Sequence, residues 1–208
     1  MFKYLNKNLN KMKIFIIIAS VILVLFIVFQ SFMVVAVNKT EDQNYSVILE
    51  EQNFQIRFYP SATMATISSD AKTYKELSGS GFRKLAGYIF GGNEDGTQIA
   101  MTSPVHMNVN DTLSTMSFVM PSFYNMDNLP KPNDSGVQLS TTDEEYVAVI
   151  RFGGFASDQD LKNYSVKLKT ILKEKGITSI GTPRYLGYNP PYQLVGRRNE
   201  IIVSIKWE

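Results

Sequence analysis

The chain lacks cysteine, and His106 is the only histidine among its 208 residues. The absence of cysteine excludes disulfide bonds, thiolate catalysis and a lipid-modified cysteine anchor. A single histidine excludes a multi-histidine zinc site and most pairs of nucleophile and general base. Acidic neighbours such as Glu50 and Glu51 are adjacent in sequence and have no recognisable acid–base geometry. The composition therefore disfavours an enzyme.

Acidic residues are also missing from the N-terminal segment, where none precedes Glu41. Residues 1–13 contain four lysines, and residues 14–37 form an uncharged apolar run. A helix over that run is about 36 Å long, against roughly 30 Å of membrane hydrocarbon. The positive-inside bias then predicts a cytoplasmic basic tail (1–13), a single-pass transmembrane anchor (14–37) and a non-cytoplasmic domain. The alternative is a cleaved signal peptide followed by secretion, with residues 34 and 36 at the small-residue positions of the cleavage site.

Beyond the anchor, the chain has no excess of positive charge. Residues 38–208 contain 17 Lys and Arg against 19 Asp and Glu, a net charge of −2. A nucleic-acid-binding domain normally presents a basic surface, so we predict no nucleic-acid partner. We expect the lysines of the tail to contact anionic membrane lipids.

The first half of the remaining chain begins with a polar linker at residues 38–45, so the globular domain is assigned to residues 46–208. Alternating apolar residues on both sides of Pro60 predict two adjacent antiparallel strands. An apolar period of 3.6 predicts a helix up to residue 89, capped by Asp70. Gly79 and Gly81 lie inside this helix, and they either weaken its first turn or leave room for a flat ligand.

The second half repeats the order of elements. Ser157 and Asp160 form a capping-box pattern at the start of a second helix, and Gly176 marks its end. Strands are predicted on both sides of the helices, over residues 97–109, 114–121, 145–155, 183–192 and 199–207. Strand, helix, strand, strand thus occurs twice, in 46–120 and in 137–207, which favours an α+β fold with antiparallel strands.

Several segments of this domain resemble the SOUL haem-binding family. The segments are FQIRFYP, GFRKLAGYIFGGN, IAMTSPVHM, FVMPSFYNMDNLPKPND, VAVIRFGG and YNPPYQLVGRRNEIIV. They follow the order and spacing of the family across residues 46–208. The resemblance implies a distorted antiparallel β-barrel of two pseudo-repeated halves, each with a flanking helix, here preceded by the N-terminal transmembrane helix. It also implies non-covalent binding of haem or a related tetrapyrrole.

The resemblance further implies a shallow apolar groove for the porphyrin beside the first helix. The apolar contacts would come from the helix and from the loop before the last strand, through Phe82, Leu85, Ile89, Tyr192, Leu194 and Val195. The basic side chains nearest the propionates would be Arg83, Lys84 and Arg197. The three helix residues share one face and so also fit a plain core contact. Arg197 equally fits a turn or ion-pair residue.

His106 is the only strong nitrogen ligand that the chain offers to an iron. Alternation along its strand places it on the more polar face, with Thr102, Pro104 and Asn108. This pattern favours an ordinary exposed histidine, and axial ligation of haem iron is the alternative. The resemblance gives His106 no inherited role.

Together these observations predict a membrane-anchored, non-catalytic tetrapyrrole-binding protein that binds, buffers or delivers haem. The SOUL fold is also similar to small-molecule effector-binding and hydrolytic domains. A hydrolytic or tetrapyrrole-modifying enzyme is therefore one alternative, and an anchored protein-interaction scaffold is another.

Overall fold

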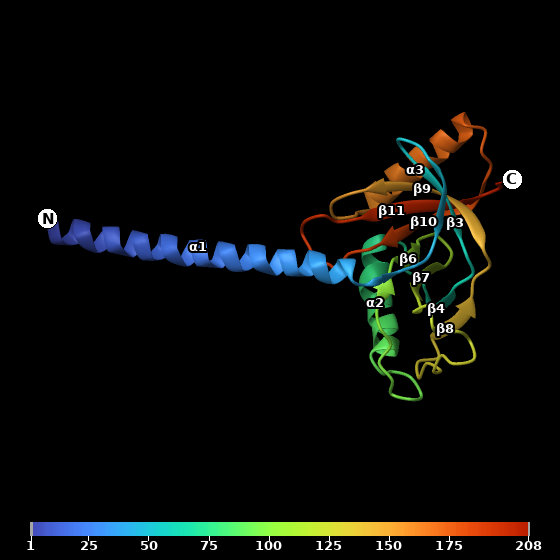
Figure 1. Ribbon diagram of the computed structural model, residues 1–208, viewed down its shortest axis with the longest axis horizontal. Coiled ribbons are helices and arrows are strands. Elements are labelled where there is room, and N and C mark those ends of the chain that lie inside the picture. The colour runs from blue at the N-terminus through green and yellow to red at the C-terminus, as the bar shows by residue number, and fades with distance from the viewer. Residues whose placement is uncertain (1, 208) are drawn as a thin grey trace.

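A computed structural model describes residues 2–207, and its most conspicuous element is the long N-terminal helix α1 (Phe2–Asn38). This helix projects away from the rest of the chain (Figure 1). Its segment Lys11–Val37 is long and apolar enough to cross a membrane, by length and composition. The apolar helix that the sequence predicts is therefore present.

The rest of the chain is built on one large sheet. Its strands are β2 (Ser46–Glu50), β3 (Gln55–Tyr59), β4 (Thr63–Ser69), β6 (Val105–Asn108), β7 (Ser114–Val119), β8 (Val137–Thr141), β9 (Glu145–Phe152), β10 (Ser179–Gly187) and β11 (Asn199–Ile205). They are antiparallel and lie in the order β2-β3-β9-β11-β10-β6-β7-β4-β8. A separate parallel pair joins β1 (Glu41–Asp42) to β5 (Thr102–Ser103).

Alternation along the strands gives the sheet two different faces. Helices α2 (Tyr74–Ile89) and α3 (Asp158–Glu174) contact one of them, which we call the helix-bearing face. In β11, Ile201 and Val203 face the main apolar core beneath these helices. Glu200 and Ile202 alternate with them and point to the opposite face, where Ile202 belongs to a second, smaller apolar cluster. This period of two follows from the strand pleat.

The predicted order of elements is confirmed, but the pairing of the first strands is not as predicted. The sequence predicts that the strands on either side of Pro60 are neighbours, whereas β3 pairs with β2 and β9, and β4 pairs with β7 and β8. The two halves therefore exchange a strand. Among the described residues the edge strands β2 and β8 pair with no further strand, so the sheet is open and a closed barrel is not seen.

The two helices differ in how well their local signals predict them. In α3 the capping box of Ser157 and Asp160 is formed, and Gly176 follows the helix with a positive φ of 70°. In α2 the cap is Thr73 instead of the predicted Asp70, because the Thr73 hydroxyl accepts a hydrogen bond from the backbone N–H of Glu76. Helix α2 is continuous through its glycines, so its first turn is not broken.

Candidate functional site

The helix residues proposed for a tetrapyrrole groove divide into two groups. Leu85 and Ile89 are 0% and 1% exposed and belong to the core. Phe82 is 40% exposed, and its ring lies edge-on to Phe118 with centroids 5.3 Å apart. Gly81 faces the sheet, because a Cβ there would lie 3.1 Å from Ile67 Cδ1. Of these four, only Phe82 presents a surface to a ligand.

The loop between β10 and β11 supplies the other apolar residues of the proposed groove. Tyr192, Leu194 and Val195 are 53%, 48% and 64% exposed. Arg197 is folded into the base of this loop: its Nη1 donates to the carbonyls of Pro190 and Gln193 at 2.7 and 2.8 Å. Its guanidinium also lies over the ring of Phe155. Arg197 therefore holds the loop in shape and is already hydrogen-bonded at the positions where it would bind a propionate.

Phe82 and the loop lie at the same end of the sheet. Phe118, which contacts Phe82, pairs with Val105 in β6, and Val105 pairs with Gly187 at the end of β10. Two strand spacings separate Phe118 from Gly187, a distance of roughly 10 Å. The loop starts directly after Gly187. The start of the loop therefore lies about two strand spacings from the strand position beneath Phe82.

Two further cations lie on the exposed side of α2. Arg83 and Lys84 follow Phe82 directly and are both exposed. Neither side chain forms an ion pair with the residues that the structure describes. Arg83 is available to an anionic group bound beside Phe82, whereas the Nζ of Lys84 lies near Gly136, which precedes the edge strand β8.

His106 is buried, contrary to the exposed position that its strand pattern favours. It is 9% exposed, and its Nε2 lies 2.7 Å from the Oε1 of Gln43. Gln43 belongs to the predicted linker, which is fixed to the sheet by the pairing of β1 with β5 and covers the histidine. Because an amide oxygen only accepts, Nε2 carries the proton. Burial, and then the charge of Arg184, lower the pKa of His106 to about 3, so the ring is neutral.

The position of His106 separates it from the proposed groove. Met107, the next residue, lies in the core of the helix-bearing face together with Phe118. His106 consequently points to the opposite face, into a polar cleft of about 390 Å³. The sheet lies between this histidine and Phe82. His106 is thus not an axial ligand for a tetrapyrrole bound at Phe82.

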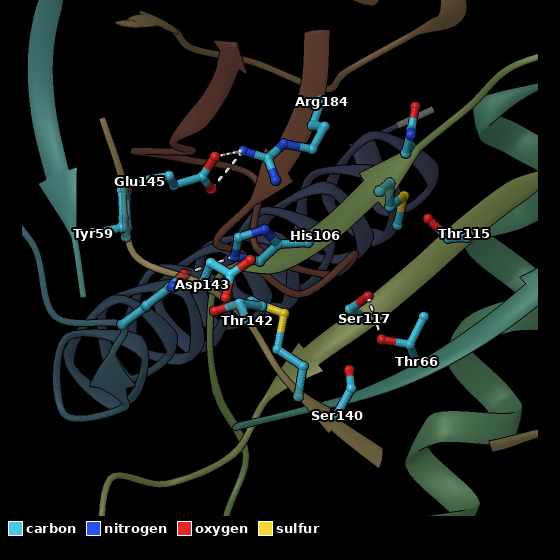
Figure 2. Close-up of a pocket in the computed structure, with 14 residues that line it drawn as sticks. Tyr59, Thr66, His106, Thr115, Ser117, Ser140, Thr142, Asp143, Glu145 and Arg184 are labelled. Atoms are coloured by element: carbon cyan, nitrogen blue, oxygen red, sulfur yellow. Dashed lines mark hydrogen bonds and ion pairs between the residues drawn. The ribbon is translucent and has the colours of Figure 1, made fainter. Parts of the chain in front are cut away.

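The polar cleft has a charged wall and a hydroxyl-bearing wall, as Figure 2 shows. Arg184 Nη2 contacts both carboxylate oxygens of Glu145, at 2.6 and 2.8 Å. On neighbouring strands, the hydroxyls of Thr66 and Ser117 are 2.8 Å apart. Asn108 also lines this cleft, and its Oδ1 is buried without a hydrogen-bond partner among the described residues. Most of the side chains that line the cleft are polar or charged.

A buried ionic network lies deeper on the opposite face. Glu200 is 0% exposed and accepts hydrogen bonds from Arg57 at 2.8 and 3.1 Å, from Arg198 at 3.0 Å and from the Tyr188 hydroxyl at 2.8 Å. Burial raises the pKa of Glu200, but the hydrogen bond and charge of Arg57 and the charge of Arg198 outweigh it and lower the pKa overall. Glu200 thus receives four hydrogen bonds from three polar partners within the protein. This network is structural, and its sequence signal is a glutamate inside the apolar strand NEIIV.

The open antiparallel sheet carries two helices on one face and consists of two similar halves, which defines a class of α+β domain. Comparisons with known proteins identify the family. The family model described as SOUL heme-binding protein matches residues 40–204. Heme-binding protein 2 of Mus musculus is 32% identical over 72% of this chain and 76% of its own length. Heme-binding protein 1 of Xenopus laevis is 31% identical over 71% of this chain and 81% of its own length. The chain belongs to the SOUL heme-binding protein family.

Solved structures with low sequence identity share the fold. The C-terminal domain of EcmrR has a TM-score of 0.54 and 10% identity, and the match covers 79% of this chain and 99% of that domain. A hydrolase from Listeria innocua has a TM-score of 0.52 and 9% identity, over 76% of this chain and 94% of that one. The expected likeness to effector-binding and hydrolytic domains is therefore confirmed for the fold alone.

Proposed function

We propose that the protein is a membrane-anchored, non-catalytic haem-binding protein that buffers or delivers haem or a related tetrapyrrole outside the cytoplasm. Membership of the SOUL family supports haem as the ligand. The proposed position of the haem site rests on a group of exposed apolar side chains at one end of the helix-bearing face. These are Phe82 from α2 and Tyr192, Leu194 and Val195 from the loop. Burying such side chains against a flat apolar ring supplies affinity of roughly 25 cal/mol per Å² before the costs of association.

The other candidate residues take different roles in this proposal. Arg83 orients one propionate in this proposal, because it is exposed and follows Phe82 directly. Lys84 is also exposed, but its Nζ lies near Gly136 and must move to reach a second propionate. Leu85 and Ile89 fix α2 on the sheet from below, and Arg197 fixes the loop. The ring is held mainly by apolar contacts, and His106 takes no part in them.

A hemin titration of the full chain in detergent micelles, followed by the Soret absorbance, tests this proposal. Phe82→Ala should weaken binding about five-fold, equivalent to about 1 kcal/mol for a half-buried phenylalanine that loses its contact. Phe90→Ala is the matched control, because Phe90 ends the same helix and is 65% exposed. Wild-type protein that shows no saturable Soret change would refute haem binding. Equal effects of the two variants would place the ring elsewhere.

The polar cleft favours a second candidate function, the binding of a small polar molecule. Arg184, the neutral His106 and the unpartnered Asn108 oxygen supply its polar groups. In the same titration, His106→Ala should leave hemin affinity within a few-fold of the wild type. A loss of about 100-fold, or about 2.7 kcal/mol, in His106→Ala with none in Phe82→Ala would move the ligand into the cleft.

The proposed membrane anchor is supported by a contact between α1 and the domain. Gln30 of α1 is hydrogen-bonded to the loop between β10 and β11, so cleavage near Val37 would remove part of the domain's own packing. Four lysines before the apolar run support a cytoplasmic tail through the positive-inside bias. A protease added to intact cells should therefore digest the domain. Protection until the membrane is opened would reverse the topology, and a mature chain beginning near Val37 would establish a signal peptide.

A further inference from the structure

The loop that closes the proposed groove also contacts the apolar helix α1 (Figure 1). The Nε2 of Gln30 donates to the carbonyl of Tyr192 at 3.2 Å, and the Oε1 of Gln30 accepts from the backbone N–H of Leu194 at 3.0 Å. Gln30 is 7% exposed, although it belongs to a helix whose other side chains are mostly exposed. The Gln30 amide therefore both donates to and accepts from the loop backbone at this point.

The two hydrogen bonds between Gln30 and the loop stabilise the contact most strongly inside a membrane, where no water can replace either partner. Gln30 is the only side-chain amide in residues 14–37, and an amide facing hydrocarbon without a partner costs several kcal/mol. The carbonyl of Tyr192 and the N–H of Leu194 belong to irregular backbone, which is tolerated at membrane depth where protein covers its polar groups. The two hydrogen bonds cover these two backbone groups with the Gln30 amide and so lower both penalties.

The depth of the contact follows from the helix geometry. In the last turns of α1, Gln30 is buried and the partly buried side chains are Met33, Val34, Ala36 and Val37. All of them except Ala36 lie on one stripe of the helix. Gln30 lies about 10 Å along the axis before Val37, at 1.5 Å per residue. With the apolar run centred on roughly 30 Å of hydrocarbon, Gln30 is about 7 Å inside the boundary. The loop bonded to it must then lie below the membrane surface.

We propose that the tip of this loop, residues 192–195, is embedded in the hydrocarbon of the leaflet on the domain's side. The chemistry of the tip fits lipid acyl chains: Leu194 and Val195 are exposed and aliphatic, and Tyr192 has the amphipathic ring typical of membrane interfaces. Gln193, the remaining residue, is buried and donates to the carbonyl of Val195. The embedding rests on the proposed membrane anchor and holds the proposed haem groove at the membrane surface.

Quenching of tryptophan fluorescence by lipids brominated on their acyl chains tests the depth of the loop. The full chain is reconstituted in vesicles in a Trp207→Phe background, which removes the only native tryptophan. Leu194→Trp reports on the loop and Phe26→Trp on the anchor. Ile180→Trp is the matched exposed control, because Ile180 and Leu194 are both 48% exposed. Ile180 lies at the start of β10, whereas Leu194 lies in the loop that follows the end of this strand.

We expect Leu194→Trp to be quenched several-fold more strongly than Ile180→Trp and about as strongly as Phe26→Trp. Quenching of Leu194→Trp no stronger than that of Ile180→Trp overturns the proposal. If Phe26→Trp is strongly quenched in that case, the anchor stands and only the loop is misplaced. If neither is quenched, the anchor fails too. No tetrapyrrole is present, so haem binding is judged separately.

A second pair of variants tests the role of Gln30. In the Leu194→Trp protein, Gln30→Leu leaves the backbone of the loop without its partners, so the loop should rise towards water and lose most of its quenching. Ser20→Leu is the control, because it also removes a polar side chain from the apolar run but lies ten residues away from Gln30. Equal quenching in the two variants would show that Gln30 does not hold the loop in the membrane.

Discussion

The two faces of the sheet are formed by the same strands but are stabilised by different forces. The helix-bearing face buries aliphatic, aromatic and methionine side chains under α2 and α3, such as Leu85, Met116 and Leu168. The opposite face buries the Glu200 network and His106. Packing energy is nearly independent of pH, whereas buried ionisable groups link folding to protons. The faces should therefore respond differently to truncation and to acid.

The largest expected effect is the loss of Glu200. Glu200→Ala leaves the guanidinium of Arg57 buried at 4% exposure without its carboxylate, and breaking a buried pair in this way costs about 3–5 kcal/mol. The free energy of unfolding can be measured by urea titration in detergent micelles, followed by the fluorescence of Trp207. A loss below about 1 kcal/mol would show that water reaches this network.

Glu200→Gln is the companion variant where the alanine variant does not fold. It keeps the size of the side chain and one of the two acceptor oxygens, although its NH2 group faces donors, so it should cost less than alanine, which also leaves a cavity. Because the pKa of Glu200 is lowered in the folded protein, its contribution is complete above the unfolded value near 4.5 and is lost as the pH falls below it. The glutamine variant should lose that part of the acid sensitivity.

The core of the helix-bearing face should respond to truncation without responding to pH. Leu85 is 0% exposed in this core, so Leu85→Ala should cost about 3 kcal/mol through lost burial and the cavity that remains. The same loss is expected at pH 7 and at pH 5 in the urea titration. If the loss differed between pH 7 and pH 5 by about 3 kcal/mol, the helix-bearing face would be as sensitive to pH as the opposite face.

His106 should make the opposite face sensitive to mild acid. Its pKa is lowered to about 3 in the folded protein, so the unfolded chain takes up the proton first, near pH 6.5. Stability is then complete above pH 6.5 and falls by about 1.4 kcal/mol per pH unit below it, until the folded pKa is reached. Between pH 6.5 and 4.5, His106→Gln should be nearly flat. Because the chain has one histidine, an unchanged slope would contradict the burial of this ring.

Local signals in the sequence predicted the elements well. Helix α3 begins and ends where Ser157, Asp160 and Gly176 indicate, because a capping box and a left-handed glycine act within a few residues. Family motifs predicted the two halves and the helix on each. The apolar run predicted α1 without any tertiary information.

Contacts between distant segments could not be predicted in the same way. His106 is buried by Gln43, 63 residues earlier, and β3 pairs with β9 across the whole first half. Alternation correctly separates His106 from the face of Met107, but it cannot show that the opposite face is covered too. In the candidate site, the helical period cannot separate Phe82 from Leu85 and Ile89, because the sheet decides which of them remains exposed.

The smallest expected effect concerns how closely α2 packs on the sheet. Gly79 and Gly81 are two residues apart in the same helix, and alanine is favoured over glycine there by about 0.5–1 kcal/mol. A Cβ at Gly79 meets nothing within 4 Å, so Gly79→Ala should stabilise the protein by about that amount. A Cβ at Gly81 meets Ile67 at 3.1 Å and Met116 at 3.3 Å, so Gly81→Ala should gain clearly less, since both side chains must move. The difference between the two urea midpoints measures how closely α2 is packed on the sheet. Equal gains would mean that space remains beneath Gly81, as the alternative of a flat ligand at this glycine requires.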